Sequence, residues 1–171
     1  MTGAAPRKDE GRPAFGLPGR IQAPNSKART LALVGLGEGG AAIAREVARE
    51  GLAHLEVHVL AKSATGGDPL AAIQAGGGDL QRDLMGADMI FLVACRGDDA
   101  SLAPVVSRIA HSRNHPVTAL YIVAPGGEAG AEDETLRTLR TGAEMLVVVS
   151  DASYVPAMIH ALAPERLEET P

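Results

Sequence analysis

Aromatic residues are scarce in this chain: its 171 residues include no tryptophan, two tyrosines and two phenylalanines. A hydrophobic core must therefore be built from valine, leucine, isoleucine and alanine, which favours α/β layers over a β-sandwich. The scarcity also argues against proteins that bind single-stranded nucleic acid, because those stack bases on aromatic side chains. We therefore expect no nucleic-acid partner.

Cysteine and long apolar runs are also lacking. The single Cys95 has no partner for an internal disulfide, which is typical of a reducing compartment. No apolar run is long enough to span a bilayer, and the N-terminal residues lack the hydrophobic core of a secretory signal. These features together predict a soluble cytoplasmic protein without a membrane span.

The net charge of −5 hides an asymmetry along the chain. Residues 1–29 carry six basic and two acidic residues, a net +4, so the remainder carries 10 basic and 19 acidic residues, a net −9. Few large apolar residues occur in this basic segment, which predicts a disordered tail over 1–28. The tail is either an arm for an acidic partner or a solvated leader, and its scattered charges favour the leader. We expect one folded domain over 29–163 and a second disordered tail over 164–171.

The most informative stretch is a glycine-rich segment between an apolar run and a helical pattern. Residues 31–34 are read as a buried strand and 41–50 as a helix. The glycines between them allow a sharp turn, after which the first helical N–H groups can face an anion. The spacing of Gly35, Gly37 and Gly40 fits the dinucleotide-binding fingerprint, although a turn without a ligand explains it too.

Strand and helix patterns alternate along the rest of the chain. Strands are expected at 55–60, 88–94, 117–123 and 145–149, and helices at 69–75, 79–84, about 102–112, 132–140 and 154–162. Asp98 or Asp99 is expected to cap the helix that ends near 112. This pattern predicts a three-layer, Rossmann-like α/β fold. Its mostly parallel five-stranded sheet has the expected order 3-2-1-4-5, with helices on both faces.

Several stretches in succession resemble the amino-terminal GTP-binding half of the bacterial division protein FtsZ. They are the glycine segment 34–40, residues 66–69, 86–94 and 103–110, and, before the family's central helix, 144–151. The resemblance covers roughly residues 29–154 and implies the nucleotide-binding domain shared by FtsZ and tubulin. It also implies that GTP or GDP is held by the loops after the first and third strands. The residues concerned are Gly35, Gly37, Glu38, Gly39, Gly40, Arg96, Gly97, Asp98, Asp99, Ala100 and Ser101.

The chain departs from the family at the phosphate loop after the third strand. FtsZ-like proteins have a run of glycines and threonines there, whereas residues 95–101 are shorter and carry Asp98 and Asp99. Carboxylates repel a phosphate by about 1–4 kcal/mol at ~4 Å, and Glu38 adds a third negative group that Arg96 offsets in part. The two aspartates are either Mg²⁺ ligands or, as preferred here, a helix cap at Asp99 and a solvated loop residue at Asp98.

Three functions remain open. The first is an FtsZ-like nucleotide-binding module that acts through a protein partner or as a homo-oligomer. The family's catalytic loop and second domain lie beyond the matched stretch, so we expect hydrolysis to be lost and assign no catalytic residue. The second is an NADP-binding oxidoreductase subunit, in which Lys62 and Ser63 hold the 2′-phosphate. The third is a docking protein that binds no nucleotide.

Overall fold

The structure is a computed structural model that describes residues 29–60, 73, 80–123 and 133–162. Five strands alternate with helices in these residues, as the sequence predicts. The strands are β1 (Leu31–Leu36), β2 (Leu55–Leu60), β3 (Met89–Cys95), β4 (Val117–Ile122) and β5 (Met145–Val149). The helices are α1 (Gly37–Arg49), α3 (Leu80–Gly86), α4 (Ala103–His111), α5 (Glu134–Gly142) and α6 (Tyr154–Leu162). Apart from Ile73, the expected helix at 69–75 lies outside the described residues, as do both expected tails.

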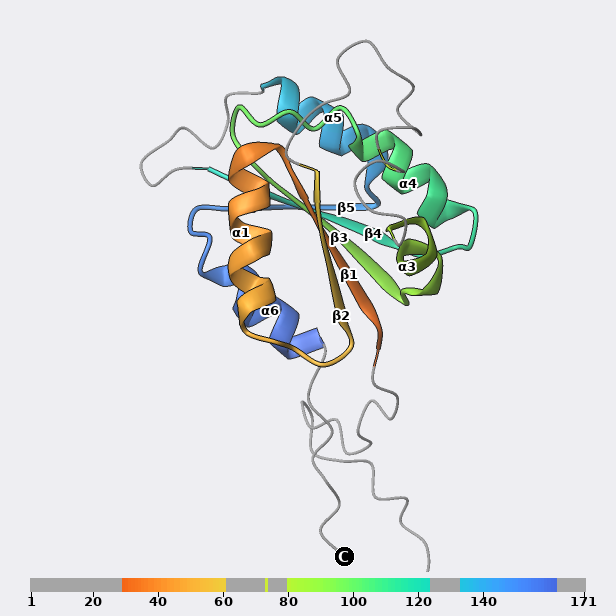
Figure 1. Ribbon diagram of the computed structural model, residues 1–171. Helices are drawn as coiled ribbons and strands as arrows, with labels where there is room; N and C mark the ends of the chain where they lie inside the picture. The colour runs from red at the N-terminus through yellow and green to blue at the C-terminus, as the bar shows by residue number, and fades with distance from the viewer. Residues whose placement is uncertain (1–28, 61–72, 74–79, 124–132, 163–171) are drawn as a thin grey trace, which may run out of the picture.

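All five strands are parallel and form one sheet in the order β2-β1-β3-β4-β5. Helices cover both of its faces (Figure 1), so the predicted Rossmann-like α/β fold is confirmed. The chain runs from β1 outward to β2, then crosses to the other side of β1 and continues through β3 and β4 to β5. The direction of winding therefore reverses between β1 and β3.

The predicted strand order 3-2-1-4-5 is wrong, because it places β3 at an edge of the sheet. Residues Ile90–Ala94 of β3 are apolar, and each is at most 1% exposed, so both faces of this strand are covered. An interior position between β1 and β4 provides that cover. The edge strand is instead β2, in which Glu56 is exposed and His58 is half-buried.

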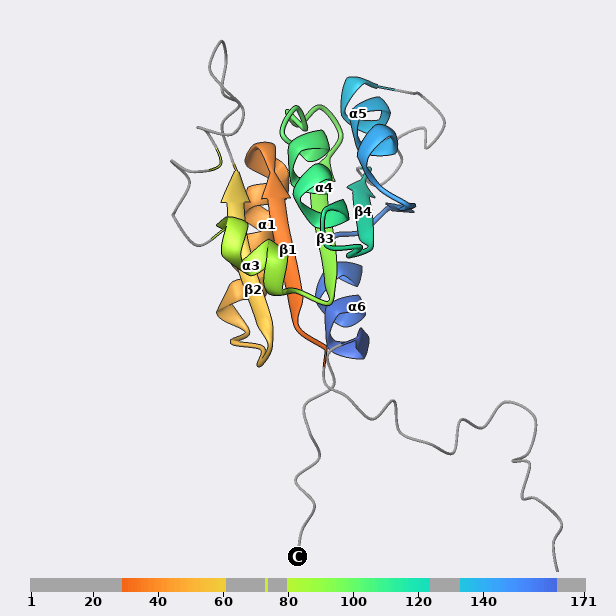
Figure 2. The same cartoon turned by 90° about the vertical axis from the view of Figure 1, so that its right-hand side faces the viewer.

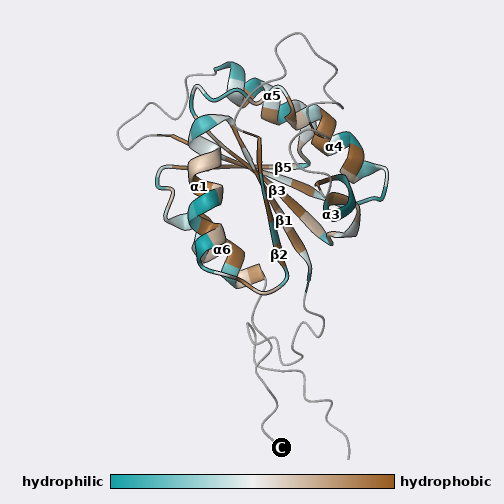
Figure 3. Cartoon of the chain, viewed as in Figure 1, coloured by the Kyte–Doolittle hydropathy of each residue, from teal (hydrophilic) through white to brown (hydrophobic). Residues whose placement is uncertain are grey.

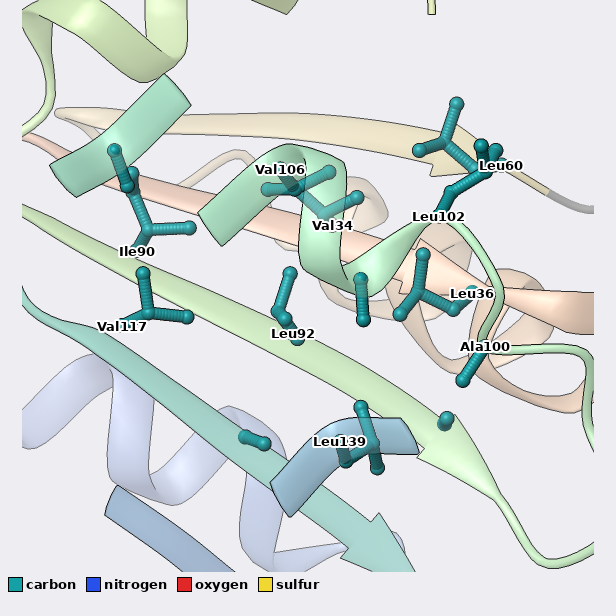
Figure 4. Close-up of a cluster of buried hydrophobic side chains, with 14 of the residues drawn as sticks. Val34, Leu36, Leu60, Ile90, Leu92, Ala100, Leu102, Val106, Val117 and Leu139 are labelled. Atoms are coloured by element: carbon teal, nitrogen blue, oxygen red, sulfur yellow. The ribbon is translucent and has the colours of Figure 1, made fainter. Parts of the chain in front are cut away.

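The helices form two layers, with α1 and α6 on one face of the sheet and α3, α4 and α5 on the other (Figures 1 and 2). In α1, for example, Ala44 and Val47 are buried against the sheet while Arg45 and Glu46 are exposed, and Figure 3 shows this mixture of hydrophobic and hydrophilic residues. The larger core cluster lies beneath α3, α4 and α5 and includes Val34, Leu92, Val106 and Leu139 (Figure 4). No helix in the described part of the chain is long and apolar enough to cross a membrane.

Candidate functional site

Ligands of doubly wound sheets bind beyond the carboxyl ends of the strands, at the point where the strand order reverses. In this protein that point lies between β1 and β3. Two segments meet there: the glycine-rich first turn of α1, directly after β1, and the loop from Arg96 to Leu102 after β3. We call this place the switch-point crevice. The expected site residues in both segments are therefore brought together.

The glycines of the first segment are required by close packing of the protein against itself. A Cβ on Gly35 would lie 2.5 Å from the carbonyl oxygen of Gly40. A Cβ on Gly40 would collide with the carbonyl oxygen of Val93 in β3. Contact between backbones thus fixes two of the three fingerprint glycines, because α1 lies directly against the sheet at this end.

Gly37, the second fingerprint glycine, faces an aspartate. It has a φ of 66°, which favours glycine, and a Cβ there would lie 2.6 Å from the Cβ of Asp98. In a dinucleotide-binding turn the second glycine lets the pyrophosphate approach the backbone. Here the close approach is made by a side chain of the protein itself.

The Asp98 carboxylate is bound at the N-terminus of α1. Its Oδ1 accepts a hydrogen bond from the N–H of Gly39 at 3.0 Å, and its Oδ2 accepts from the N–H of Gly40 at 2.8 Å. Oδ2 also accepts from the N–H of Cys95 at 2.7 Å. Free N–H groups at a helix N-terminus and the helix dipole both favour an anion. Asp98 supplies that anion from within the chain.

Two of the sequence-based expectations for the aspartates are therefore wrong. Asp98 is half-buried and hydrogen-bonded rather than solvated, and neither aspartate caps α4, whose N-cap position is Leu102 without a side-chain hydrogen bond. Asp99 is exposed and accepts from the N–H of Ser101 at 2.9 Å.

The α1 segment also differs from the expectation, since the helix begins at Gly37 rather than at 41. The carboxylate of Asp98 provides the acceptors that its first turn needs.

The loop after β3 directs its own N–H groups into the protein. The N–H of Arg96 donates to the carbonyl oxygen of Ile122 at 2.9 Å, and that of Gly97 donates to Oδ2 of Asp133 at 3.0 Å. The N–H of Asp98 donates to the carbonyl oxygen of Cys95 at 3.0 Å. Consecutive N–H groups that would surround a phosphate are thus engaged elsewhere.

Buried apolar residues anchor the second half of this loop. Ala100 and Leu102 are 3% and 5% exposed and belong to the core cluster beneath α3, α4 and α5 (Figure 4). The backbone also closes a turn there, because the N–H of Ala103 donates to the carbonyl oxygen of Ala100 at 2.8 Å. The loop is therefore held at both ends, by Asp98 and by the core.

Asp133 is a second carboxylate that organises this edge, and the sequence analysis did not single it out. It is the N-cap of α5: its Oδ1 accepts from the N–H of Leu136 at 2.8 Å while its Oδ2 binds Gly97. Burial raises the pKa of Asp133, but these N–H donors and the nearby charge of Arg96 lower the pKa by more than burial raises it. The net pKa therefore lies below its ordinary value. An aspartate three residues before an apolar helical position was the signal available in the sequence.

A cavity of about 420 Å³ opens beside the loop, between it and the start of α5. Four carboxylate side chains line it, together with three hydroxyl side chains. The carboxylates are Asp98, Asp99, Asp133 and Glu134, and the hydroxyls are Ser101, Thr135 and Thr138. Such a lining repels nucleotide phosphates. Within the described residues, no group of three histidine, cysteine or acidic side chains is placed to hold a metal ion.

Of the remaining expected site residues, two are exposed in the segments that form the crevice and two lie beyond the described residues. Glu38 is exposed in the first turn of α1, and Arg96 is exposed with its charge acting on Asp133. Lys62 and Ser63 lie outside the described residues. Burial and the charge of Asp98 raise the pKa of the half-buried Cys95 thiol, which disfavours a reactive thiolate.

The sequence matches no protein-family model, and no curated protein matches it. Among solved structures, it is similar to one from Burkholderia pseudomallei K96243, described as a candidate pilus assembly-related protein. That match has 12% sequence identity and a TM-score of 0.40, and it covers 80% of this chain and 90% of the other. At this level of similarity the neighbour carries no argument about the function of this chain.

Proposed function

We propose that this chain is an FtsZ/tubulin-like domain that binds no nucleotide and acts as a docking module, with Asp98 in place of the phosphate. The observation that carries the proposal is the set of three hydrogen bonds from the N–H groups of Gly39, Gly40 and Cys95 to one carboxylate. Two of these donors, the N–H groups of Gly39 and Gly40, belong to the first turn of the helix after β1, where dinucleotide-binding α/β folds bind phosphate.

A nucleotide meets two obstacles in the switch-point crevice. Its phosphate must displace Asp98, leaving the displaced carboxylate to find new partners, and it must then approach Asp99 and Asp133. Each unit charge at ~4 Å costs about 1–4 kcal/mol at surface-like dielectric, and a phosphate carries about two charges. The residues present therefore do not fit GTP, GDP or NADP, and we derive no hydrolysis or hydride transfer from them.

Thermal unfolding with and without ligands tests this proposal. GTP, GDP, NADPH and NADP, each with and without Mg²⁺, are expected to leave the melting temperature of the wild-type chain unchanged. A ligand at 100 times its Kd would stabilise the fold by about 2.7 kcal/mol, a shift of several degrees. A rise with guanine nucleotides alone would restore a GTP-binding function, and a rise with NADP or NADPH alone would point to the oxidoreductase subunit.

Two aspartate variants make the experiment specific to the crevice. Asp98→Ala leaves the α1 N-terminus without its anion, so the melting temperature is expected to fall and inorganic phosphate to recover part of the loss. The matched control is Asp99→Ala, which removes the same charge one residue along the chain, where the carboxylate accepts from the N–H of Ser101. An equal response of both variants to phosphate would show that general charge, rather than the bound carboxylate, excludes anions.

A further inference from the structure

The two edges of the sheet differ in how they are protected from other strands. An exposed edge strand presents unpaired N–H and C=O groups, and proteins usually protect it with charged residues, proline or bulges. At one edge, β2 carries the exposed Glu56, and the Nε2 of His58 lies 3.2 Å from the Asp83 carboxylate. At the other edge, β5 consists of Met145, Leu146, Val147, Val148 and Val149. The described strand β5 itself carries no charged residue, proline or bulge.

The exposed apolar side chains gather in the same part of the chain. The large hydrophobic residues most exposed among those described are Met145 at 58%, Val148 at 44% and Tyr154 at 59%. Two of them belong to β5 and the third begins α6. Met145 and Val148 thus expose apolar side chains on the two faces of the β5 edge.

Among the described strands, none pairs with the outer side of β5. The carbonyl oxygen of Val149 accepts from the N–H of Val123 at 2.9 Å, so the polar groups of Val149 face β4. Because successive residues of a strand direct these groups to alternate sides, the N–H and C=O of Val148 face the free edge. A neighbouring strand would therefore find a donor and an acceptor at Val148.

We propose that a second copy of this chain covers this edge, with two β5 strands paired antiparallel around a two-fold axis near Val147. The paired strands are apolar on both faces. Leu146 packs with the cluster beneath α3, α4 and α5, and Val147 packs with the cluster beneath α1 and α6. The strand is uncharged along its length, so homotypic pairing brings no like charges together within it. The resulting contact is isologous, as expected for a two-fold dimer.

The charges that flank β5 select the antiparallel arrangement. Residues equidistant from Val147 oppose each other in it, so Glu144 meets Ser150 of the second copy and Asp151 meets its Ala143. Parallel pairing in register would place Glu144 against Glu144 and Asp151 against Asp151. Like charges directly opposite each other destabilise a strand pair, so the antiparallel dimer is favoured.

The dimer is expected to be reversible. A pair of five-residue strands buries less than the ~1,000 Å² that a stable, specific interface needs, so dissociation on dilution should be measurable. The inference is independent of the proposed function, because β5 lies at the sheet edge and its pairing involves neither Asp98 nor the glycines of α1.

Sedimentation velocity over a range of concentrations, without nucleotide, tests the pairing. The wild-type chain is expected to change from monomer to dimer as the concentration rises. Val148→Lys places a charge on the edge and should raise the dimer dissociation constant about tenfold or more. The matched control is Ala42→Lys, which adds the same charge on the exposed side of α1 and should dimerise like the wild type.

A second variant separates loss of pairing from loss of folding. Val148→Pro removes only an N–H that faces the free edge, a place where strands tolerate proline, so the variant should fold and remain monomeric. In the wild-type dimer, the Val148 amide should exchange with deuterium more slowly at high concentration than at low. A wild-type chain that stays monomeric throughout, or folded Val148 variants that dimerise as the wild type does, would overturn the proposal.

Discussion

The switch-point crevice and the outer edge of β5 differ in how far the protein satisfies its own polar groups. In the crevice, the N–H groups of Gly39 and Gly40 are bound by Asp98, and those of Arg96 and Gly97 by Ile122 and Asp133. At β5, no strand of the described part of the chain lies beside the outward N–H and C=O of Val148. The place where this fold usually takes a ligand is closed from within, and a strand edge is left open. Interaction with other molecules is therefore expected at the edge rather than in the crevice.

The largest effect is expected from a methyl group placed in the switch-point crevice. Gly40→Ala drives a Cβ into the carbonyl oxygen of Val93, and neither backbone can yield without α1 moving off β3. We expect the free energy of unfolding to fall by about 3 kcal/mol or more, measured by urea denaturation. That is a large fraction of the total stability of a domain of this size.

Gly86→Ala is the matched control for this substitution. Gly86 ends α3, and a Cβ there would have no neighbour within 4 Å. Alanine should therefore be neutral or stabilising by a few tenths of a kcal/mol, because it restricts the unfolded chain. Comparable losses for the two variants would mean that the crevice is not closely packed.

The sequence allowed most elements to be placed but left their arrangement open. The ranges of β2, β5 and α6 agree with the expectation, since each is a short patterned segment between clear breaks. The order of the strands was wrong although a signal existed: β2 alternates with Glu56 and His58, whereas β3 is apolar throughout. An alternating strand suits an edge, and a continuous apolar strand suits the interior.

The role of Asp98 could not be read from the sequence for a different reason. Its hydrogen bonds with Gly39 and Gly40 join residues 59 and 58 positions apart, and they exist only because β1 and β3 are neighbours in the sheet. The carboxylates of the loop could be read from the sequence. That one of them binds the N–H groups at the start of α1 depends on the three-dimensional position of the loop.

A moderate effect is expected beside the switch-point crevice, where Asp133 joins the loop after β3 to α5. Asp133→Ala removes the N-cap of α5 and the acceptor for the N–H of Gly97. Loss of a cap costs about 0.5–2 kcal/mol, so urea denaturation should show a loss of about 1 kcal/mol. The Gly97 amide should also exchange with deuterium faster.

Glu134→Ala is the control for the cap, because Glu134 is the next residue and its exposed carboxylate pairs with Arg137. Its loss should be smaller, and Gly97 exchange should be unchanged. Unchanged exchange at Gly97 in the Asp133→Ala variant would show that the loop is held by Asp98 and the core alone.

The smallest effect is expected at the start of β5, where Glu144 ties the open strand to the rest of the sheet. Its Oε2 accepts from the N–H of Val117 at 2.7 Å, and its Oε1 pairs with Nε2 of His111 at the end of α4. Burial raises the pKa of Glu144, but the Val117 N–H, its own N–H and the charge of His111 outweigh this, so the net pKa is lowered. The carboxylate side chain is 50% exposed, which limits its contribution to less than about 1 kcal/mol.

The pH dependence follows from the sign of this shift. A group whose pKa is lower in the folded state stabilises fully above its unfolded pKa, which is near 4.5 for glutamate, and that contribution disappears as the pH falls through the folded value. The wild type should therefore exceed Glu144→Gln in stability at about pH 6, and the difference should close toward about pH 3. Glu56→Gln, at the exposed position of the opposite edge, should show no such closing difference. If the gap between wild type and Glu144→Gln instead widens in acid, the Glu144 carboxylate does not help to hold β5, and the strand is held by its backbone pairing with β4 and its apolar contacts.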